Sequence, residues 1–409
     1  MGVKSLRNKA KNFIDERKSF LKNAYSRYQD RRENIKGRIH YAKTTSVGEL
    51  NKRLSELKES KSPIDMARVV HGLTNSSIWL GHSYYRYLKT TLDLKTALHD
   101  LEFSQEDETI LKIIANPNKK LPDHISMQEV FEVVFKELEY AHFHKSYHPL
   151  VYSRPIKTTI VLISGVLNEI FSTPAFERAA IELHRKHGIK YICPEVKGMK
   201  GVETNVLLLE NQLREYIEQN PKEKLWIIGF SKGAIDVLHY LKHNREFANK
   251  HIVGLSTIAG PILGSEHTDH KLLKGLSLIH DFAETRGIKN KDVLFKEIYQ
   301  SLSASFQGPW FENNHKKLPK LKFYTSLALE SSWYESHVWM ILTKTFFQSS
   351  KPNDGIVDVE HAHFPDYFKA LNLGTYPGHH LIGQRSSHFP QESLIEAHLI
   401  VLNKLGLLD

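Results

Sequence analysis

Short apolar strands alternate with helices in the second half of the chain, and this alternation constrains the fold more than any other feature. Residues 158–163 form a β-branched apolar run that ends in Ser164-Gly165, as expected of a strand buried on both faces. The same pattern predicts strands at 191–193, 224–229, 252–259 and 321–329, with helices at 174–187, 206–217 and 234–243. Strands separated by such helices predict an α/β fold, with a mostly parallel sheet covered by helices on both faces.

The domain organisation follows from where this alternation begins and where it is interrupted. The chain has 409 residues, more than the roughly 250–300 that one hydrophobic core usually serves. Residues 1–150 have helical periodicity, whereas residues 151–409 carry the alternation. Between about 265 and 318 the alternation stops and apolar residues recur at helical spacing. We therefore expect an N-terminal helical region at 1–150, an α/β domain at 151–409 and a helical cap insertion at about 265–318.

Positive charge is concentrated at the N-terminus. The net charge is +10, and residues 1–50 hold 13 Lys and Arg against 5 Asp and Glu, a balance of +8. The rest of the chain is nearly neutral, so its charge gives no reason to expect a nucleic-acid partner. The amphipathic pattern is most basic within residues 1–40. A cationic helix at 4–36 suits an anionic membrane surface. The alternative is packing against the protein with its charged face in solvent.

Several classes of site are not indicated by the sequence. Cys193 is the only cysteine, which excludes an internal disulfide and a multi-cysteine metal site. Close histidine pairs such as His142 and His144 lack the full ligand set of a zinc site, and the glycine patterns of nucleotide-binding loops are missing. We expect neither cofactor nor metal. No apolar run spans a bilayer, and the first residues lack a secretory signal, so we expect a cytoplasmic protein, with peripheral membrane association left open.

Residues 229–233 read Gly-Phe-Ser-Lys-Gly, which matches the pattern G-x-S-x-G. The segment follows an apolar strand and opens a helix at Ala234, as a nucleophile elbow requires. A sharp turn from strand to helix lifts the hydroxyl of Ser231 above the sheet, and the flanking glycines allow close backbone packing. The helix N-terminus adds a positive dipole end near a developing oxyanion. The segment predicts that Ser231 is a nucleophile.

With this elbow, residues 155–409 resemble the α/β-hydrolase superfamily and, within it, the bacterial lipases and related esterases. The resemblance implies an acid and a histidine after the serine in chain order. The segment around Asp354 reads Asn-Asp-Gly-Ile-Val and is similar to the one in which lipases carry their catalytic aspartate, which implies Asp354 as the acid. Turn chemistry explains the same residues. Glu330, just after the strand at 321–329, is the competing acid.

The resemblance also implies an oxyanion hole made by two backbone N–H groups. One belongs to Lys232, the residue after the nucleophile. The other comes from the loop after the strand at 158–163, where lipases have His-Gly followed by an apolar residue. This chain has Ser164-Gly165-Val166 there, a partial match. We expect Val166 to be the second donor, with Leu167 as the alternative.

Two interpretations of the C-terminus assign the general base differently. If the last strand is 378–384, His388 lies in the loop that follows it. If the last strand is 370–376, His380 occupies that loop and His388 begins the next helix. The first is favoured because Leu381-Ile382-Gly383 is apolar and leads into a polar turn before Pro390. We therefore expect His388 to be the base and His380 to be structural.

These expectations combine into a serine hydrolase of carboxylic esters that acts through an acyl-enzyme on Ser231, with Asp354 and His388 as its partners. Its substrate would be a small-molecule or lipid ester, since the apolar cap at 265–318 could line an acyl pocket. Lys232 and Ala234 replace residues more usual in lipases, which leaves the substrate open. A thioesterase or an acyltransferase on the same fold is one alternative. A non-catalytic interaction protein that uses the N-terminal helices is the other.

Overall fold

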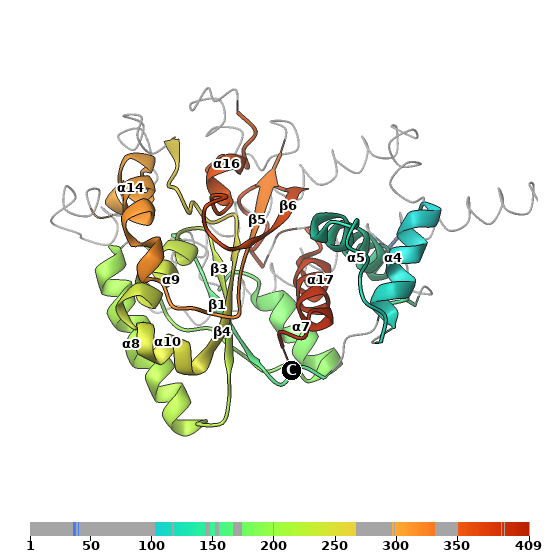
Figure 1. Ribbon diagram of the computed structural model, residues 1–409, viewed down its shortest axis with the longest axis horizontal. Helices are drawn as coiled ribbons and strands as arrows, with labels where there is room; N and C mark the ends of the chain where they lie inside the picture. Colours follow the sequence, from blue (N-terminus) through green and yellow to red (C-terminus); the bar gives the residue numbers. More distant parts are fainter. Residues whose placement is uncertain are drawn as a thin grey trace, which may run out of the picture.

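The computed structural model describes residues 103–116, 118–143, 148–151, 155–166, 174–198, 200–266, 299–331, 351–385 and 389–408, with the isolated residues 36, 37, 40, 297 and 387. Its centre is a six-stranded, all-parallel sheet in the order β2-β1-β3-β4-β5-β6 (Figure 1). The strands are β1 (Thr159–Ile163), β2 (Tyr191–Ile192), β3 (Leu225–Phe230), β4 (Ile252–Ile258), β5 (Phe323–Glu330) and β6 (Leu371–Pro377). The described helices are α4 (Gln105–Ala115), α5 (Met127–Phe143), α7 (Glu177–His187), α8 (Val202–Gln219), α9 (Lys232–His243), α10 (Arg245–His251), α14 (Ala304–Asn314), the 3-10 helix η2 (His315–Lys317), α16 (Val359–Ala362) and α17 (Gln391–Lys404).

The chain changes direction across the sheet after β2. It runs from β1 through α7 to β2 at one edge, and then through α8 to β3 on the other side of β1. Parallel crossovers are right-handed, so the reversal places α7 and α8 on opposite faces of the sheet (Figure 1). The carboxyl ends of β1 and β3 therefore form a topological switch point. In open α/β sheets this is where a ligand site is built.

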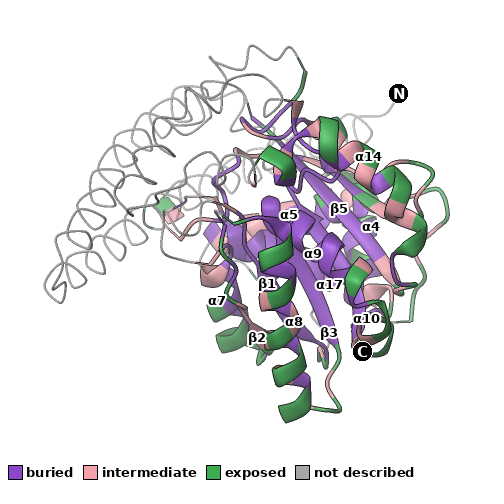
Figure 2. Ribbon diagram, turned by 90° about the vertical axis from the view of Figure 1, so that its left-hand side faces the viewer, coloured by how far each residue is buried: buried purple, intermediate pink, exposed green. Residues whose placement is uncertain are grey.

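The central strands contribute to two hydrophobic cores because successive side chains point to opposite faces. Leu225 and Ile227 lie in the core under α8, α9 and α14. Trp226 and Ile228 lie in the core under α7 and α17. Figure 2 shows the result, a buried sheet flanked by helices that expose only their outer faces. The predicted α/β fold with helices on both faces is confirmed.

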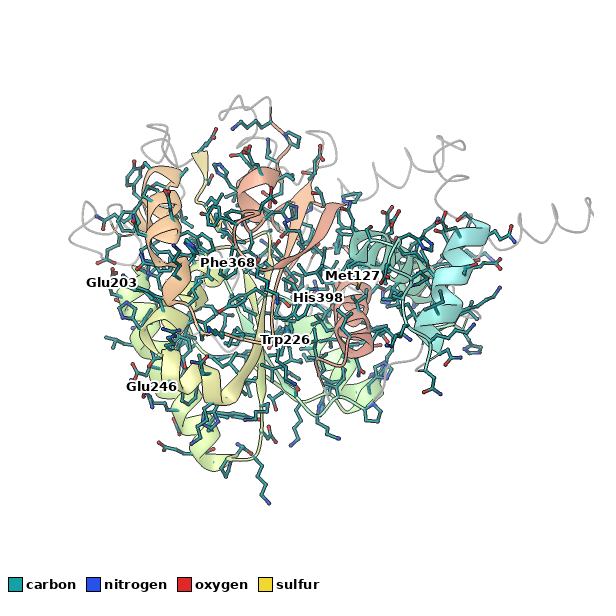
Figure 3. The ribbon with its side chains drawn as sticks, in the orientation of Figure 1. Met127, Glu203, Trp226, Glu246, Phe368 and His398 are labelled. Atoms are coloured by element: carbon teal, nitrogen blue, oxygen red, sulfur yellow. The ribbon has the colours of Figure 1, made fainter. Side chains whose placement is uncertain are left out.

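Several polar groups inside the core under α7 and α17 share hydrogen bonds around Ser256. Trp226 Nε1 donates to Ser256 Oγ at 2.8 Å, and Nε2 of His398 lies 2.6 Å from the same oxygen. Figure 3 shows Trp226 and His398 between the sheet and α17. Burial lowers the pKa of His398 to about 3, so its imidazole is neutral. These bonds join β3, β4 and α17 around one serine hydroxyl.

Helices α4 and α5 come from the predicted N-terminal region and pack into the core under α17. Almost every side chain of α17 is buried, a pattern that requires neighbours on more than one side of the helix. α5 supplies the outer neighbour, since the ring of Phe131 lies 5.8 Å from the imidazole of His398 on α17. Phe131 and Phe135 also meet β6 through Tyr376, at ring-centroid distances of 5.0 and 6.0 Å. This part of residues 1–150 is therefore continuous with the core of the sheet domain. The division at residue 150 stays a prediction.

Two segments of the chain, here called excursions, leave the sheet at the carboxyl ends of its strands. Each is tied back to its starting point by a backbone hydrogen bond. The N–H of Ser265 donates to the carbonyl of Leu302 at 2.7 Å, so the segment between them is closed at its base. The N–H of Ser331 donates to the carbonyl of Asn353 at 3.1 Å and closes a second segment after β5. Within the predicted cap, α14 buries Phe311 against the sheet.

Other expectations concern residues outside this description. Residues 267–296, which form most of the predicted cap, are not among the described residues. Of residues 4–36, with their expected membrane contact, the structure describes residue 36 alone. Along the described part of the chain, no helix combines the length and the apolar character needed to cross a membrane.

Near the amino ends of β1, β2 and β3, the carboxylate of Glu223 accepts three hydrogen bonds. The donors are the ammonium of Lys190 and the hydroxyls of Thr159 and Tyr216, the last at 2.6 Å. Burial raises the pKa of this carboxyl, but the three donors outweigh burial and hold the pKa at about 2, below its usual 4.5. The carboxylate thus links β1, α8 and the residue before β2.

Replacing Glu223 by Gln is expected to lower the free energy of unfolding at neutral pH. Because the folded pKa is depressed, this stabilisation is fully present above pH 4.5 and is lost as the pH falls toward 2. Urea denaturation across this pH range should show that the difference in free energy of unfolding between wild type and variant becomes smaller as the pH falls. Tyr216→Phe removes one donor and should cost less. A difference in free energy of unfolding that does not change with pH would contradict the lowered pKa of Glu223.

Candidate active site

Ser231 lies between β3 and α9 in a backbone conformation that side chains rarely adopt, with φ 55° and ψ −133°. Such strain persists only where the surrounding structure enforces it. A Cβ on Gly233 would lie 2.5 Å from the carbonyl oxygen of Ile163, and one on Gly229 would lie 2.8 Å from Ala234 Cα. Both glycines are therefore required by close backbone packing. This is the geometry of a nucleophile elbow.

The hydroxyl of Ser231 points away from the helix that it begins. A serine at the start of a helix usually accepts a hydrogen bond from the first turn, but Ser231 makes no such bond. Its Oγ lies 2.6 Å from Nε2 of His380 instead. The serine is 8 % exposed and the histidine 1 %, so little water reaches this bond. The imidazole also stacks on Phe230, with ring centroids 5.5 Å apart.

The last strand is not where the sequence pattern suggested. β6 ends at Pro377, and residues 378–384 form turns, so the strand predicted at 378–384 is wrong. Leu381 and Ile382 are apolar because this loop is buried, at 2 % and 1 % exposure. Burial and strand formation give the same apolar signal in a run this short.

The position of the last strand bears on which histidine lies beside Ser231. The preference for His388 depended on the strand at 378–384, whereas His380, the second candidate, makes the hydrogen bond to Ser231. The side chain of His388 lies outside the described residues. Pro377-Gly378, a strand-breaking pair just before His380, is the sequence signal that would have favoured the other interpretation.

Asp354 completes the hydrogen-bonded chain. Its Oδ2 lies 2.6 Å from Nδ1 of His380, and its Oδ1 accepts the N–H groups of Ile356 and Val357, both at 2.9 Å. The carboxylate is 1 % exposed. Its own backbone carbonyl accepts the N–H of His380 at 3.0 Å. Both side chain and backbone of Asp354 thus fix the position of the imidazole.

Glu330, the competing acid, ends β5 with its side chain exposed. The hydrogen bond between Ser331 and Asn353 brings the chain back to this strand end, directly before Asp354. An acid is therefore held beside the end of β5, as the position of Glu330 suggested. The side chain that reaches His380 is that of Asp354, which lies on the segment that returns to β5.

The loop after β1 lies against the serine. A Cβ on Gly165 would lie 2.9 Å from Ser231 Oγ and 3.2 Å from the backbone nitrogen of Lys232. Only a glycine can approach so closely. Val166 follows it and is half-buried, whereas Leu167 lies outside the described residues. The two predicted oxyanion donors therefore belong to segments in direct contact with the nucleophile.

Arg178 on α7 holds the loop after His380, a role that the sequence did not suggest. Its guanidinium donates to the carbonyl oxygens of Arg385, Ser387 and Phe389 at 2.7 to 2.9 Å and pairs with Glu392 at 2.6 Å. In the part of the chain with described coordinates, no cluster of three His, Cys, Asp or Glu side chains could hold a metal ion.

No protein-family model matches the sequence, and no curated protein resembles it closely enough to count as a match. Solved structures do resemble the fold. A metagenomic carboxyl esterase superposes with a TM-score of 0.51 at 20 % identity, over 62 % of this chain and 79 % of that protein. The mature lipase BlEst2 of Bacillus licheniformis gives a TM-score of 0.44 at 22 % identity, over 61 % and 94 % of the two chains. The first likeness agrees with the parallel sheet. The chain has the α/β-hydrolase fold.

Proposed function

We propose that this protein is a serine hydrolase that cleaves carboxylic esters through an acyl-enzyme on Ser231. The observation that carries the proposal is the hydrogen-bonded chain from Ser231 Oγ through both nitrogens of His380 to Asp354, with 2.6 Å at each step. The strained elbow and the burial of all three side chains support it, because chance contacts between polar side chains rarely combine both. The roles are nucleophile, general base and orienting acid.

In the acylation step, Ser231 Oγ attacks the carbonyl carbon while its proton passes to Nε2 of His380. Asp354 keeps the other proton on Nδ1 and stabilises the imidazolium. The backbone N–H groups of Lys232 and Val166 are the proposed donors to the tetrahedral oxyanion. The C–O bond to the alcohol then breaks, and the imidazolium gives its proton to the leaving oxygen.

Deacylation repeats these steps with water. His380 takes one proton from the water as its oxygen attacks the acyl carbon, and Ser231 leaves with that proton restored. The carboxyl esterase of similar fold makes a carboxylic ester the first substrate class to test. A thioester or an alcohol acceptor in place of water would use the same groups.

A fluorophosphonate probe tests the proposal directly. We expect the purified protein to be labelled, the labelled peptide to contain Ser231, and p-nitrophenyl esters to be hydrolysed with a burst of p-nitrophenol. Ser231→Ala should neither be labelled nor give a burst. A folded wild-type protein that resists labelling would refute the proposal and favour a binding role. Labelling with turnover of thioesters alone would reassign the substrate but leave the nucleophile unchanged.

A further inference from the structure

A buried ion pair lies directly behind the nucleophile. Lys232 and Asp236 occupy successive turns of α9, at 0 % and 1 % exposure. The ammonium of Lys232 lies 2.8 and 3.0 Å from the two carboxylate oxygens of Asp236. Burial raises the pKa of the Asp236 carboxyl, and Lys232 opposes that effect. Removing two charges from water is costly, and a buried pair is often no more stabilising than apolar residues of the same size. The pair therefore calls for an explanation other than stability.

Asn205 on α8 connects this pair to another segment. Its side-chain nitrogen donates to Asp236 Oδ2 at 2.8 Å and to the carbonyl of Lys197 at 3.0 Å. Its side-chain oxygen accepts the N–H of Lys197 at 2.9 Å. Asn205 is itself completely buried. One amide thus holds both backbone groups of a residue in the loop between β2 and α8.

The residue after Lys197 supports the loop beside the nucleophile. A Cβ on Gly198 would lie 2.6 Å from the carbonyl oxygen of Val166 and 2.9 Å from that of Gly165. Gly165 in turn lies against Ser231 and the backbone nitrogen of Lys232. The contacts therefore close a ring. It runs from the side chain of Lys232, through the buried polar groups and two loops, back to the backbone of Lys232.

We propose that Lys232, Asp236 and Asn205 form a positioning network that fixes the distance between the two oxyanion donors, the N–H groups of Lys232 and Val166. This inference rests on the proposed function. One donor is attached to the network covalently, and the other is supported by the loop that Asn205 holds. Donors act on a transition state only if they are held in place before the charge develops. A buried ion pair with a bridging amide restricts such movement more than apolar packing would, because each bond has a fixed direction.

Asn205→Ala tests the network, and Gln212→Ala is its matched control. Gln212 lies on the same helix and holds the same loop in the same way, since its side chain bonds both backbone groups of Glu195 at 2.7 and 2.8 Å. It does not touch the ion pair. With p-nitrophenyl acetate we expect Asn205→Ala to lower kcat about 10- to 100-fold, somewhat less than the loss of a whole oxyanion donor, while KM changes little. Gln212→Ala should keep the wild-type kcat.

A trifluoromethyl ketone supplies the readout that a purely structural role would not change. Its adduct with Ser231 carries an oxyanion in the hole, so its inhibition constant should rise by the same factor by which kcat falls. If Asn205→Ala does not fold, the double variant Lys232→Met/Asp236→Leu removes both charges together and should show the same paired changes. Replacement by apolar residues leaves no buried charge without a partner.

The outcomes separate this inference from the proposed function. If the wild type hydrolyses esters and Asn205→Ala matches it in kcat and in ketone affinity, the positioning network is refuted and the hydrolase stands. A fall in kcat with unchanged ketone affinity refutes the network as well. A wild type without fluorophosphonate labelling refutes the proposed function itself.

Discussion

Replacing Ser231 or His380 by Ala is expected to lower kcat for ester hydrolysis by about a millionfold, and the double variant should be no worse than either single one. The reason is that the serine and the histidine act as one unit, joined by the 2.6 Å contact between Oγ and Nε2. Removing either leaves only substrate binding and the oxyanion donors. Initial rates with a p-nitrophenyl ester, measured on protein freed of wild-type traces, check the size of the effect.

His388→Ala is the matched comparison for His380→Ala. Both remove one imidazole from the segment before α17. His380 makes hydrogen bonds to both Ser231 and Asp354, whereas the side chain of His388 lies outside the described residues. We expect His388→Ala to keep most of the activity. An inactive His388→Ala beside an active His380→Ala, with both proteins folded, would overturn the assignment of the base.

Asp354→Asn is expected to lower kcat by about 10⁴ without unfolding the protein. The carbonyl oxygen of the new amide can still accept the N–H groups of Ile356 and Val357, which now bind Oδ1 at 2.9 Å. The NH₂ group then faces Nδ1 of His380 and donates to it. This fixes the tautomer with its proton on Nε2, which can no longer take the proton of Ser231. Steady-state kinetics and thermal unfolding separate the two effects.

Glu330→Gln serves as the control, because the two acids compete for the same role at the end of β5. The side chain of Glu330 is exposed, so we expect a change in kcat too small to place it in the triad. If Glu330→Gln lost activity and Asp354→Asn kept it, the acid would have to be reassigned.

The fold was predictable because its signals are local. An apolar strand, a sharp glycine turn and a helix follow one another within residues 224–243, and each is specified by its own neighbours. Gly229 and Gly233 are required by contacts with the adjacent backbone, so the pattern and its physical cause coincide. The fold class and the location of the elbow were therefore readable without any distant contact.

Which histidine lies beside Ser231 is decided by a contact between distant segments, and no local sequence pattern encodes that contact. Leu381 and Ile382 are buried in a turn, and an apolar pair in a buried loop has the same composition as one in a strand. The position of the acid was ambiguous for a related reason. Asp354 follows a long excursion from β5, and the hydrogen bond between Ser331 and Asn353 returns it to the strand end.

The role of the N-terminal helices shows a third limit. The periodicity of residues 1–150 predicts helices, and α5 (Met127–Phe143) agrees with it. An amphipathic pattern identifies the face that is buried but not what buries it. The partner of α5 is α17, some 250 residues later in the sequence, together with β6. Such a pairing is decided by the assembled core.

The closure of the two excursions at their bases gives this scaffold a form of modularity. Because Ser265 meets Leu302 and Ser331 meets Asn353, whatever lies between each pair begins and ends at a fixed anchor. The entropy cost of closing such a loop grows only slowly with its length. Either segment can therefore become longer or shorter, or be replaced, during evolution. Selectivity can then differ among related proteins while the hydrogen-bonded Ser231, His380 and Asp354 are retained.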